Sequence, residues 1–274
     1  MCNPRRHVLA GLLKGHVLSA EIILETRGLT KEFKGFVAVN QVDLQVKRGH
    51  IHALIGPNGA GKTTFFNLLT KFLPPSAGSI SFNGADITHE KPAQTARRGI
   101  VRSFQISAVF PHMTVLDNVR AALQRNLGTS FHFWRSEKTL WPLHDRAREL
   151  LAAVDLQDFE QELTVNLPYG RKRALELATT LALEPELMLL DEPTQGMGHE
   201  DVDRVTQLIK KVSSGRTILM VEHNMSVVAR IADRITVLQR GAVIADGTYD
   251  EVSRNPLVIE AYMGTHDTEL AGAH

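Results

Sequence analysis

The stretch Gly56-Pro57-Asn58-Gly59-Ala60-Gly61-Lys62-Thr63-Thr64 has the spacing G-x4-G-K-[ST] of a phosphate-binding P-loop. In such a loop the glycines let backbone N–H groups curl around a phosphate, the lysine reaches the β and γ oxygens, and the first threonine binds Mg2+. An apolar run at 51–55 precedes the loop, and a segment of helical character follows it at 65–69. A strand, a loop and a helix N-terminus facing the anion form the context that this motif needs. The sequence therefore predicts binding of a nucleoside triphosphate.

The composition predicts a soluble protein. The 274 residues suffice for one large domain or two closely packed ones, and a net charge of +1 offers no global basic field for nucleic acid. The single cysteine, Cys2, excludes an internal disulfide framework and fits a reducing cytosol. No apolar run approaches the roughly 20 residues of a membrane-spanning helix, so work at a membrane requires a partner polypeptide. Residues 1–20 are predicted to be a flexible extension, because Lys14 and His16 interrupt the apolar stretch too early for a secretory signal.

Short apolar runs elsewhere in the chain also end at polar residues. The run at 99–104 ends at Gln105, the run at 187–190 ends at Asp191 and Glu192, and the run at 217–221 ends before His223. Buried parallel strands read as continuous apolar runs, and open α/β sheets bind ligands at the carboxyl ends of their strands. These runs predict one nucleotide crevice, with helices at 169–183 and 201–212 between them.

Other segments predict antiparallel structure and a helical insertion. Strands are expected at 22–26, at 39–46, and at 79–82 before the turn dipeptide Asn83-Gly84. A hairpin is expected from 235–238 and 242–245 around Gln239-Arg240-Gly241. The region 107–166 lacks strand alternation and is predicted to form a small helical subdomain.

The pair Asp191-Glu192 supplies the acidic half of a nucleotide site. A carboxylate at the end of a buried strand suits the Mg2+ shell, which is the role expected of Asp191. The adjacent Glu192 is placed to polarise a water in line with a γ-phosphate, and this speaks against a small-molecule kinase, where water must be excluded. The alternative is that the acidic pair only caps the next helix.

Together, in this order, these motifs resemble the ATP-binding subunits of ABC transporters over residues 22–264. The resemblance implies that Phe33 stacks on adenine, although a core phenylalanine is the alternative. It implies that Gln105 is the Q-loop glutamine, which senses Mg2+ and the attacking water, and that His223 is the switch histidine at the γ-phosphate. The expected fold is an α/β P-loop NTPase (RecA-like) core, 21–106 and 167–264, with an antiparallel β subdomain. The helical subdomain, 107–166, is inserted into this core, and 265–274 form a flexible tail.

The family signature Leu-Ser-Gly-Gly-Gln maps onto Leu167-Pro168-Tyr169-Gly170-Arg171, which departs from it. In the family, this segment of one subunit closes over the ATP of its partner. Pro168 offers neither a hydroxyl nor an N–H, but proline is tolerated at a first helical position and Gly170 can still present its N–H to an anion. The run Arg171-Lys172-Arg173 either adds positive charge or is a solvated face. Gly198 replaces a common aspartate in the D-loop, so communication between the two sites is expected to be looser.

Several segments resemble ATPases of branched-chain amino acid importers, a group similar to urea and amide importers and, more distantly, to lipopolysaccharide-export ATPases. They are 168–170, 192–197, 221–225 and 255–264. The resemblance implies a second ATP-binding subunit, identical or paralogous, transmembrane permease subunits, and indirectly a substrate-binding protein, at the cytoplasmic face of the membrane. Phe131, Trp134, Lys138 and Trp141 share a helical face that either docks on the permease or packs within the subdomain.

Other classes remain as alternatives to an importer of branched-chain amino acids or a related small polar or amide solute. These are a lipid or lipopolysaccharide exporter ATPase and a soluble ABC ATPase acting on nucleic acid or ribosomes, although no nucleic-acid partner is expected without a basic patch. The candidate residues form three groups. The catalytic group is Glu192, His223 and Gln105; the ATP-binding group is Phe33, Gly56, Pro57, Asn58, Gly59, Ala60, Gly61, Lys62, Thr63, Thr64, Pro168, Tyr169 and Gly170; the Mg2+ group is Thr63, Gln105 and Asp191.

Overall fold

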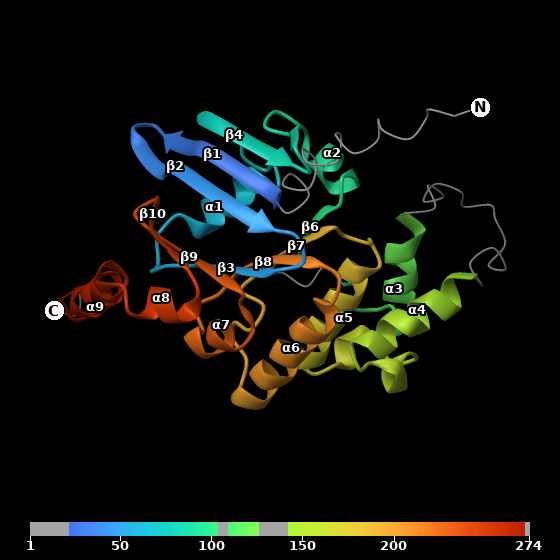
Figure 1. Ribbon diagram of the computed structural model, residues 1–274. Helices are drawn as coiled ribbons and strands as arrows, with labels where there is room; N and C mark the ends of the chain where they lie inside the picture. Colours follow the sequence, from blue (N-terminus) through green and yellow to red (C-terminus); the bar gives the residue numbers. More distant parts are fainter. Residues whose placement is uncertain (1–21, 104–108, 126–141, 272–274) are drawn as a thin grey trace, which may run out of the picture.

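The computed structural model describes residues 22–103, 109–125 and 142–271. Two β-sheets lie one above the other, and most of the helices cover the far side of the second sheet (Figure 1). The first sheet is antiparallel with the order β2-β1-β4-β5. Its strands are β1 (Ile22–Phe33), β2 (Phe36–Lys47), β4 (Ala77–Phe82) and β5 (Ala85–Asp86).

In the second sheet, the carboxyl ends of the parallel strands lie along one edge, where the sequence predicts the nucleotide-binding crevice. Its order is β10-β9-β3-β8-β7-β6, and all neighbours are parallel except the β9–β10 hairpin. The strands are β3 (Ile51–Ile55), β6 (Ile100–Ser103), β7 (Leu187–Asp191), β8 (Thr217–Val221), β9 (Arg234–Gln239) and β10 (Ala242–Gly247). Because parallel strands end on one edge, the P-loop after β3 lies beside the segments that follow β7 and β8.

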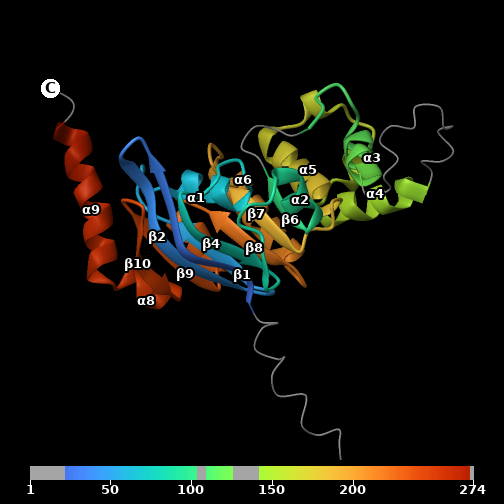
Figure 2. The ribbon, with the colours of Figure 1, turned by 90° about the horizontal axis from the view of Figure 1, so that it is seen from above.

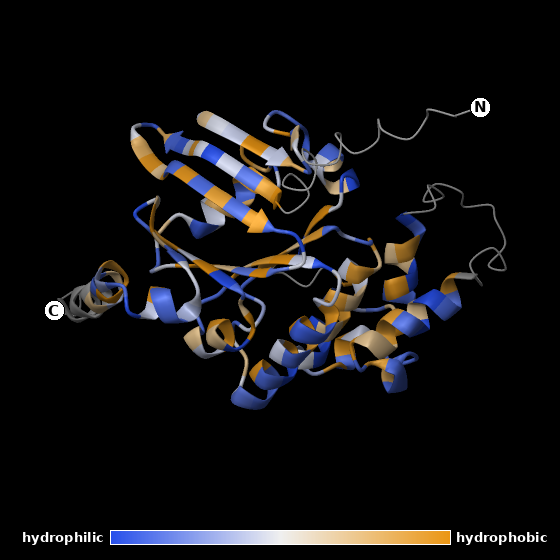
Figure 3. Ribbon diagram, in the orientation of Figure 1, coloured by the Kyte–Doolittle hydropathy of each residue, from blue (hydrophilic) through white to orange (hydrophobic). Residues whose placement is uncertain are grey.

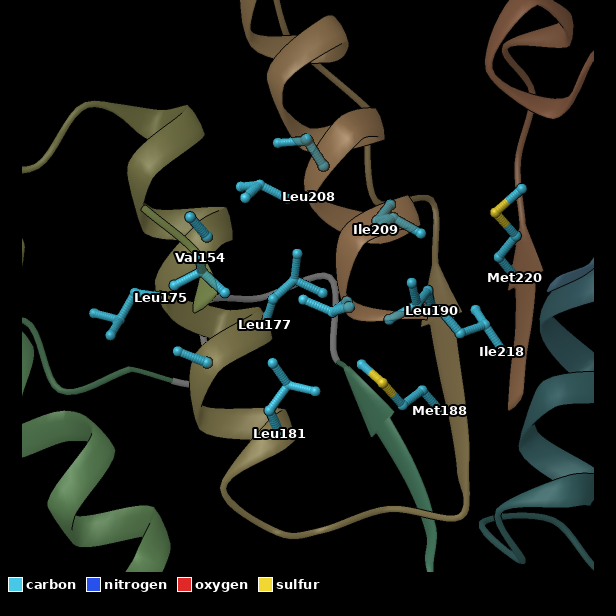
Figure 4. Packing of buried hydrophobic residues seen from close by; sticks show 14 of the residues in the cluster. Val154, Leu175, Leu177, Leu181, Met188, Leu190, Leu208, Ile209, Ile218 and Met220 are labelled. Carbon is cyan, nitrogen blue, oxygen red and sulfur yellow. The ribbon is translucent and has the colours of Figure 1, made fainter. Parts of the chain in front are cut away.

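Alternate side chains of the parallel strands enter two separate cores. On β7, Met188 and Leu190 join the core shared with the helices, whereas Leu187 and Leu189 join the core between the two sheets. Figure 4 shows the helix-side core, where leucines of α5 (Tyr169–Leu181) face these strand residues. A strand buried on both faces needs apolar residues at every position, which explains its continuous apolar sequence.

The helices lie on the faces of the second sheet and at both ends of the molecule. In Figure 2, α3 and α4 lie at one end of the molecule and α9 at the other, and Figure 1 shows α1 below the antiparallel sheet. Figure 3 shows hydrophobic and hydrophilic residues side by side on α5 and α6, as amphipathic helices require. The remaining helices are α1 (Lys62–Leu69), α2 (Pro92–Arg97), α3 (Val115–Gln124), α4 (Pro142–Ala153), α6 (His199–Val212), α7 (Met225–Ile231), α8 (Tyr249–Ser253) and α9 (Pro256–Ala271), with 3-10 turns at Gln157–Phe159 and Thr164–Asn166.

The insertion between β6 and α5 is helical where it is described. Asn118 on α3 is buried, and its amide nitrogen donates to the carbonyls of Phe110 and Thr114 and to the Thr164 hydroxyl. The Phe110 N–H donates to the Asn118 amide oxygen at 2.7 Å. One side chain therefore holds together the entry and the exit of this region.

The expected fold class is confirmed, with a few differences of extent. The antiparallel strand expected at 22–26 extends to Phe33. The apolar alternation stops after residue 26, but β1 continues to pair with β2 through several register shifts at 26–32. The helix expected at 201–212 begins earlier, at His199. Gln105, Phe131, Trp134, Lys138 and Trp141 lie outside the described residues, and the division into subdomains stays a prediction. In the part of the chain that is described, no helix has the length and apolar character to cross a membrane.

Candidate active site

The P-loop is fixed by contacts with two other strands. Gly56 has a φ of +150°, and a Cβ there would lie 2.1 Å from the carbonyl oxygen of Leu238 on β9. Gly61 has a φ of +100°, and a Cβ there would lie 2.3 Å from the carbonyl oxygen of Ala38 on β2. Both neighbours are backbone atoms of paired strands, so only glycine allows the loop to approach them this closely.

Lys62 lies across the loop at the start of α1. Its ammonium group donates to the carbonyl oxygens of Gly56 at 2.7 Å and Pro57 at 2.9 Å. The residue is 6% exposed, and burial lowers the pKa of Lys62, while the nearby carboxylates of Glu192 and Asp191 act in the opposite direction. A buried ammonium group beside a helix N-terminus attracts a phosphate strongly.

A cavity of about 220 Å3 opens over the loop. We call it the P-loop cavity. Its wall combines the P-loop, one residue of β2, and the acid–histidine pair from the other side of the sheet edge. It is lined by Ala38, Asn58, Gly59, Ala60, Gly61, Lys62, Thr63, Thr64, Glu192 and His223.

Glu192 and His223 meet on the wall of this cavity. Glu192 Oε1 and His223 Nε2 are 2.6 Å apart, with the glutamate side chain 11% and the histidine side chain 38% exposed. Parallel pairing aligns Asp191 with Val221, and the Glu192 N–H donates to the Val221 carbonyl at 3.0 Å. Glu192 has a φ of +48°, a conformation that non-glycine residues rarely adopt and that clusters at functional sites. The sheet therefore brings together two of the predicted catalytic residues.

Asp191 has a partner that the sequence analysis missed. Its Oδ2 forms an ion pair with Arg102 on β6, and Arg102 also donates to the Asn67 amide oxygen on α1 at 2.6 Å. The pair is almost fully buried, with side chains 10% and 1% exposed. The sequence did contain a signal for this ion pair: Arg102 is a charged residue inside the apolar run at 99–104, and a buried arginine requires a partner.

The residues expected to hold Mg2+ have suitable chemistry where they are described. The Oδ1 atom of Asp191 is buried and has no hydrogen-bond partner among the described residues. Thr63, which carries a hydroxyl, is among the residues that line the P-loop cavity. Within the described ranges no group of three or more His, Cys, Asp or Glu side chains gathers as a metal cage. Mg2+ in phosphate sites uses one or two protein oxygens together with waters and phosphates, so this donor set fits it.

The acidic pair does not cap the next helix. The helix α6 begins at His199, and its N-cap is Gly198, well beyond Glu192. The alternative that Phe33 is a core residue is also wrong, because Phe33 is 41% exposed near the end of β1. The Lys31 ammonium lies 5.1 Å from the centre of its ring. Stacking of Phe33 on adenine stays a prediction.

The start of α5 lies outside the P-loop cavity of its own chain. Tyr169 is the first helical residue of α5, as predicted, and Pro168 is its N-cap rather than a helical residue. Pro168 and Tyr169 are exposed, and the Tyr169 hydroxyl donates to the Gln195 carbonyl at 3.4 Å. A Cβ on Gly170 would lie 2.4 Å from a carboxylate oxygen of Asp201 on α6. Gly170 therefore allows α5 and α6 to pack closely within the chain.

The basic run after Gly170 is not a freely solvated face. The Arg171 guanidinium stacks 3.8 Å from the centre of the Phe159 ring, and Lys172 donates to the Val165 carbonyl at 3.0 Å. Arg173 is 5% exposed and pairs with Glu176 at 2.5 Å. It also donates to the Glu192 carbonyl at 3.5 Å. These cations brace the helix against its own chain, because each has an internal partner.

A P-loop at the end of a central parallel strand and a carboxylate–histidine pair facing its lysine define an ATP-hydrolysing P-loop protein. The family model of ABC transporter ATP-binding domains matches residues 39–195, more than half of the chain. A second model, described as a branched-chain amino acid ATP-binding cassette transporter, matches residues 242–268. The chain therefore belongs to the ABC transporter ATP-binding family and is an ATP-hydrolysing subunit of that class.

Individual relatives are similar over nearly the whole chain. The high-affinity branched-chain amino acid transport ATP-binding protein BraF of Pseudomonas aeruginosa is 40% identical over 252 residues, covering 88% of this chain and 98% of that protein. Its counterpart LivG of Escherichia coli is 37% identical over 254 residues with the same coverage. The crystal structure of the ADP conformation of MJ1267, an ABC transporter cassette, superposes with a TM-score of 0.78 at 28% identity, covering 89% of this chain and 99% of that one.

Proposed function

We propose that this chain hydrolyses ATP to power import of branched-chain amino acids, or a related small polar or amide solute, through a partner permease. The observation that carries the hydrolysis step is the Glu192–His223 pair at 2.6 Å, on the wall of the cavity that contains the P-loop lysine. The substrate class rests on the branched-chain amino acid transport that the relatives BraF and LivG serve, and on the family similarity at 242–268.

The proposed mechanism assigns one task to each group. Lys62 binds the β and γ oxygens, and the P-loop N–H groups cradle the phosphates. Thr63 and the Oδ1 oxygen of Asp191 would hold Mg2+, which would neutralise charge on the phosphates when bound. Glu192 accepts the proton of the attacking water, and His223 orients that carboxylate and contacts the γ-phosphate. Gln105, outside the described residues, is assigned to sensing Mg2+ and this water.

We further propose that two subunits pair head to tail around ATP. Pro168, Tyr169 and Gly170 lie outside the P-loop cavity of their own chain, so one chain supplies half of the phosphate shell. The exposed start of α5 leaves helix N–H groups accessible to a partner's phosphate. Two subunits related by a two-fold or pseudo-two-fold axis, each with its α5 start over the partner's P-loop, complete both sites at once.

The permease is proposed to dock in a groove between the sheet edge and the helical region. This groove, about 350 Å3, is lined by β6, α3 and α5 and includes the exposed ring of Phe110. It also contains Arg102, which pairs with Asp191 of the active site. An amphipathic segment of the permease seated there touches a residue that contacts the Mg2+ ligand. We propose that the chain works as a peripheral subunit at the cytoplasmic face of the membrane.

The test isolates the affinity-tagged chain from membranes of its native host in detergent. Recovered partners are identified, reconstituted into vesicles, and assayed for ATP-dependent uptake of labelled leucine and of acetamide. Copurification of a membrane-spanning protein and leucine uptake that Glu192→Gln abolishes are the expected results. Absence of a membrane-spanning partner, or uptake of neither solute by a complex that hydrolyses ATP, would contradict the proposal.

A further inference from the structure

A buried carboxylate lies directly behind the Glu192–His223 pair. Glu222 follows the last residue of β8 and is only 2% exposed. Its Oε1 accepts from the Thr194 N–H at 3.1 Å and from the Thr194 hydroxyl at 2.6 Å. Its Oε2 accepts from the N–H groups of His223 at 2.9 Å and Asn224 at 3.1 Å. Each oxygen thus receives two donors.

These donors come from the two loops that carry the proposed catalytic pair. Thr194 is two residues beyond Glu192 on the loop after β7, and His223 is the proposed switch residue on the loop after β8. The two oxygens of one side chain bond to one loop each, 28 residues apart in sequence. A buried carboxylate is tolerated only when its hydrogen bonds are satisfied, and here backbone N–H groups supply three of the four. The arrangement therefore resists any change in the spacing of the loops.

We propose that Glu222 is a positioning residue that clamps the loop of Glu192 to the loop of His223 and so sets the geometry of the 2.6 Å pair. This proposal rests on the proposed role of Glu192 in hydrolysis. Glu222 does not touch the P-loop cavity, which is lined by other residues. Its loss should therefore impair the chemical step and leave nucleotide binding to the P-loop intact.

Glutamine at position 222 breaks the clamp on one side. The amide oxygen can replace Oε2 and still accept from the two N–H groups of the switch loop. The amide nitrogen then faces the Thr194 N–H and hydroxyl, and only the hydroxyl can turn around to accept. The Thr194 N–H is left unpaired in a buried position, which costs free energy and loosens the loop of Glu192.

The experiment compares Glu222→Gln with Thr194→Val, which removes one donor, and with Thr194→Ser, which retains the hydroxyl. Glu260→Gln on the exposed face of α9 is the matched control for the change of charge. The measurements on the full chain are kcat, KM for ATP, fluorescent-nucleotide affinity and Tm. Misplacement of a catalytic group by about 1 Å can cost about 100-fold in rate, so Glu222→Gln should lower kcat about 10- to 100-fold.

In the same variant, nucleotide affinity should stay within about twofold of the wild type, because the P-loop is unchanged. Thr194→Val should lower kcat in the same direction but less, and Thr194→Ser should recover most of it. The double variant Glu222→Gln, Thr194→Val should be no slower than Glu222→Gln alone, because both changes break one clamp.

Two outcomes would overturn the proposal. One is a wild-type kcat for Glu222→Gln. The other is a fall in nucleotide affinity and Tm that matches the fall in kcat, with Thr194→Val indistinguishable from wild type, since that pattern describes a structural residue. Failure of the role proposed for Glu192 is recognised separately, because Glu192→Gln would then still hydrolyse ATP.

Discussion

The P-loop and the start of α5 both bring glycine into very close contact, but with different kinds of neighbour. At Gly61 a Cβ would lie 2.3 Å from the Ala38 carbonyl oxygen, and at Gly170 a Cβ would lie 2.4 Å from an oxygen of Asp201. The first neighbour is the backbone of a paired strand, which cannot move alone. The second is the end of a side chain that is 34% exposed and can rotate.

This difference teaches which half of the proposed site is complete in one chain. The P-loop is held in place because Gly56 and Gly61 lie against the backbone of paired strands, at Leu238 and Ala38. The start of α5 instead packs against flexible side chains and exposes Tyr169, at 46%, to its surroundings. A rigid half that binds nucleotide and an accessible half that meets a partner are what an ATP-dependent dimer requires.

The largest effect is expected from Glu192→Gln, which alters the rigid half without changing its shape. Glutamine keeps the size and the hydrogen bonding of glutamate but is a very poor base. Loss of a general base costs about 10^2- to 10^4-fold in rate, so turnover should fall by that factor while ATP affinity is retained. Single-turnover hydrolysis measures the fall, and Glu149→Gln on the exposed face of α4 is the control.

The same variant tests whether the accessible half meets a partner. With hydrolysis blocked and Mg-ATP present, sedimentation should show a dimer. The dimer should dissociate into monomers when ADP replaces ATP. A protein that binds ATP tightly but stays strictly monomeric would contradict the role proposed for the start of α5, because this helix end would then not contact a partner's phosphate.

A large structural effect is expected from Gly61→Ala. The new Cβ collides with the Ala38 carbonyl, so either the loop or β2 must move, at a cost of about 3 kcal/mol. Nucleotide affinity should fall about 100-fold if this cost is borne in binding. Gly59→Ala is the matched control, because its φ is also positive but nothing lies within 4 Å of the added Cβ.

Gly59→Ala itself should cost only the strain of the left-handed conformation, about 1–2 kcal/mol. Calorimetry and nucleotide titration on both variants separate strain from collision. Equal affinities for the two variants would show that the wall of the P-loop cavity yields more easily than its contacts indicate.

A smaller effect is expected from Gly170→Ala. Asp201 can rotate away from the new methyl group, so the free energy of unfolding should fall by about 1 kcal/mol. Nucleotide affinity of the monomer should be unchanged, because Gly170 lies outside the P-loop cavity. Adding Asp201→Ala should restore stability, and chemical denaturation measures both changes. A loss as large as that of Gly61→Ala would remove the distinction between the two halves.

The same geometry cautions against Gly170→Asp as a probe of the partner's phosphate. The new carboxylate would lie next to Asp201 of its own chain and repel it there, whatever the partner does. Gly170→Ala with Asp201→Ala is the cleaner pair for titrating ATP-driven dimerisation.

The smallest effect is expected from Pro168→Ser. Pro168 is the N-cap of α5 and makes no side-chain capping bond, so a serine hydroxyl gains about 1 kcal/mol by accepting from a free helix N–H. Removal of the proline gives the unfolded chain more conformational freedom, and this offsets about 0.4–1 kcal/mol of the gain. Tm should therefore change little, while a hydroxyl offered to the partner's phosphate should raise turnover. Turnover below wild type would show that the proline is required at this position.

The sequence alone located most of the fold because its signals are local. The P-loop spacing, the apolar strands and the turn at Gln239-Arg240-Gly241 each depend on a few neighbouring residues, and the β9–β10 hairpin formed where it was predicted. Extent was less well predicted: β1 runs to Phe33 although charged and glycine residues interrupt its alternation. Pairing with β2 and β4 overrides that local pattern, since strand length depends on neighbours distant in the sequence.

By itself, then, the sequence determined that the chain has a P-loop, an acidic strand end and a histidine beside it, because each motif encodes its own backbone geometry. Only the tertiary structure decided which groups face one another. Arg102 meets Asp191 across 89 positions, and Glu222 meets Thr194 across 28. The order of parallel strands fixes these pairs, and a single sequence carries no local signal of that order.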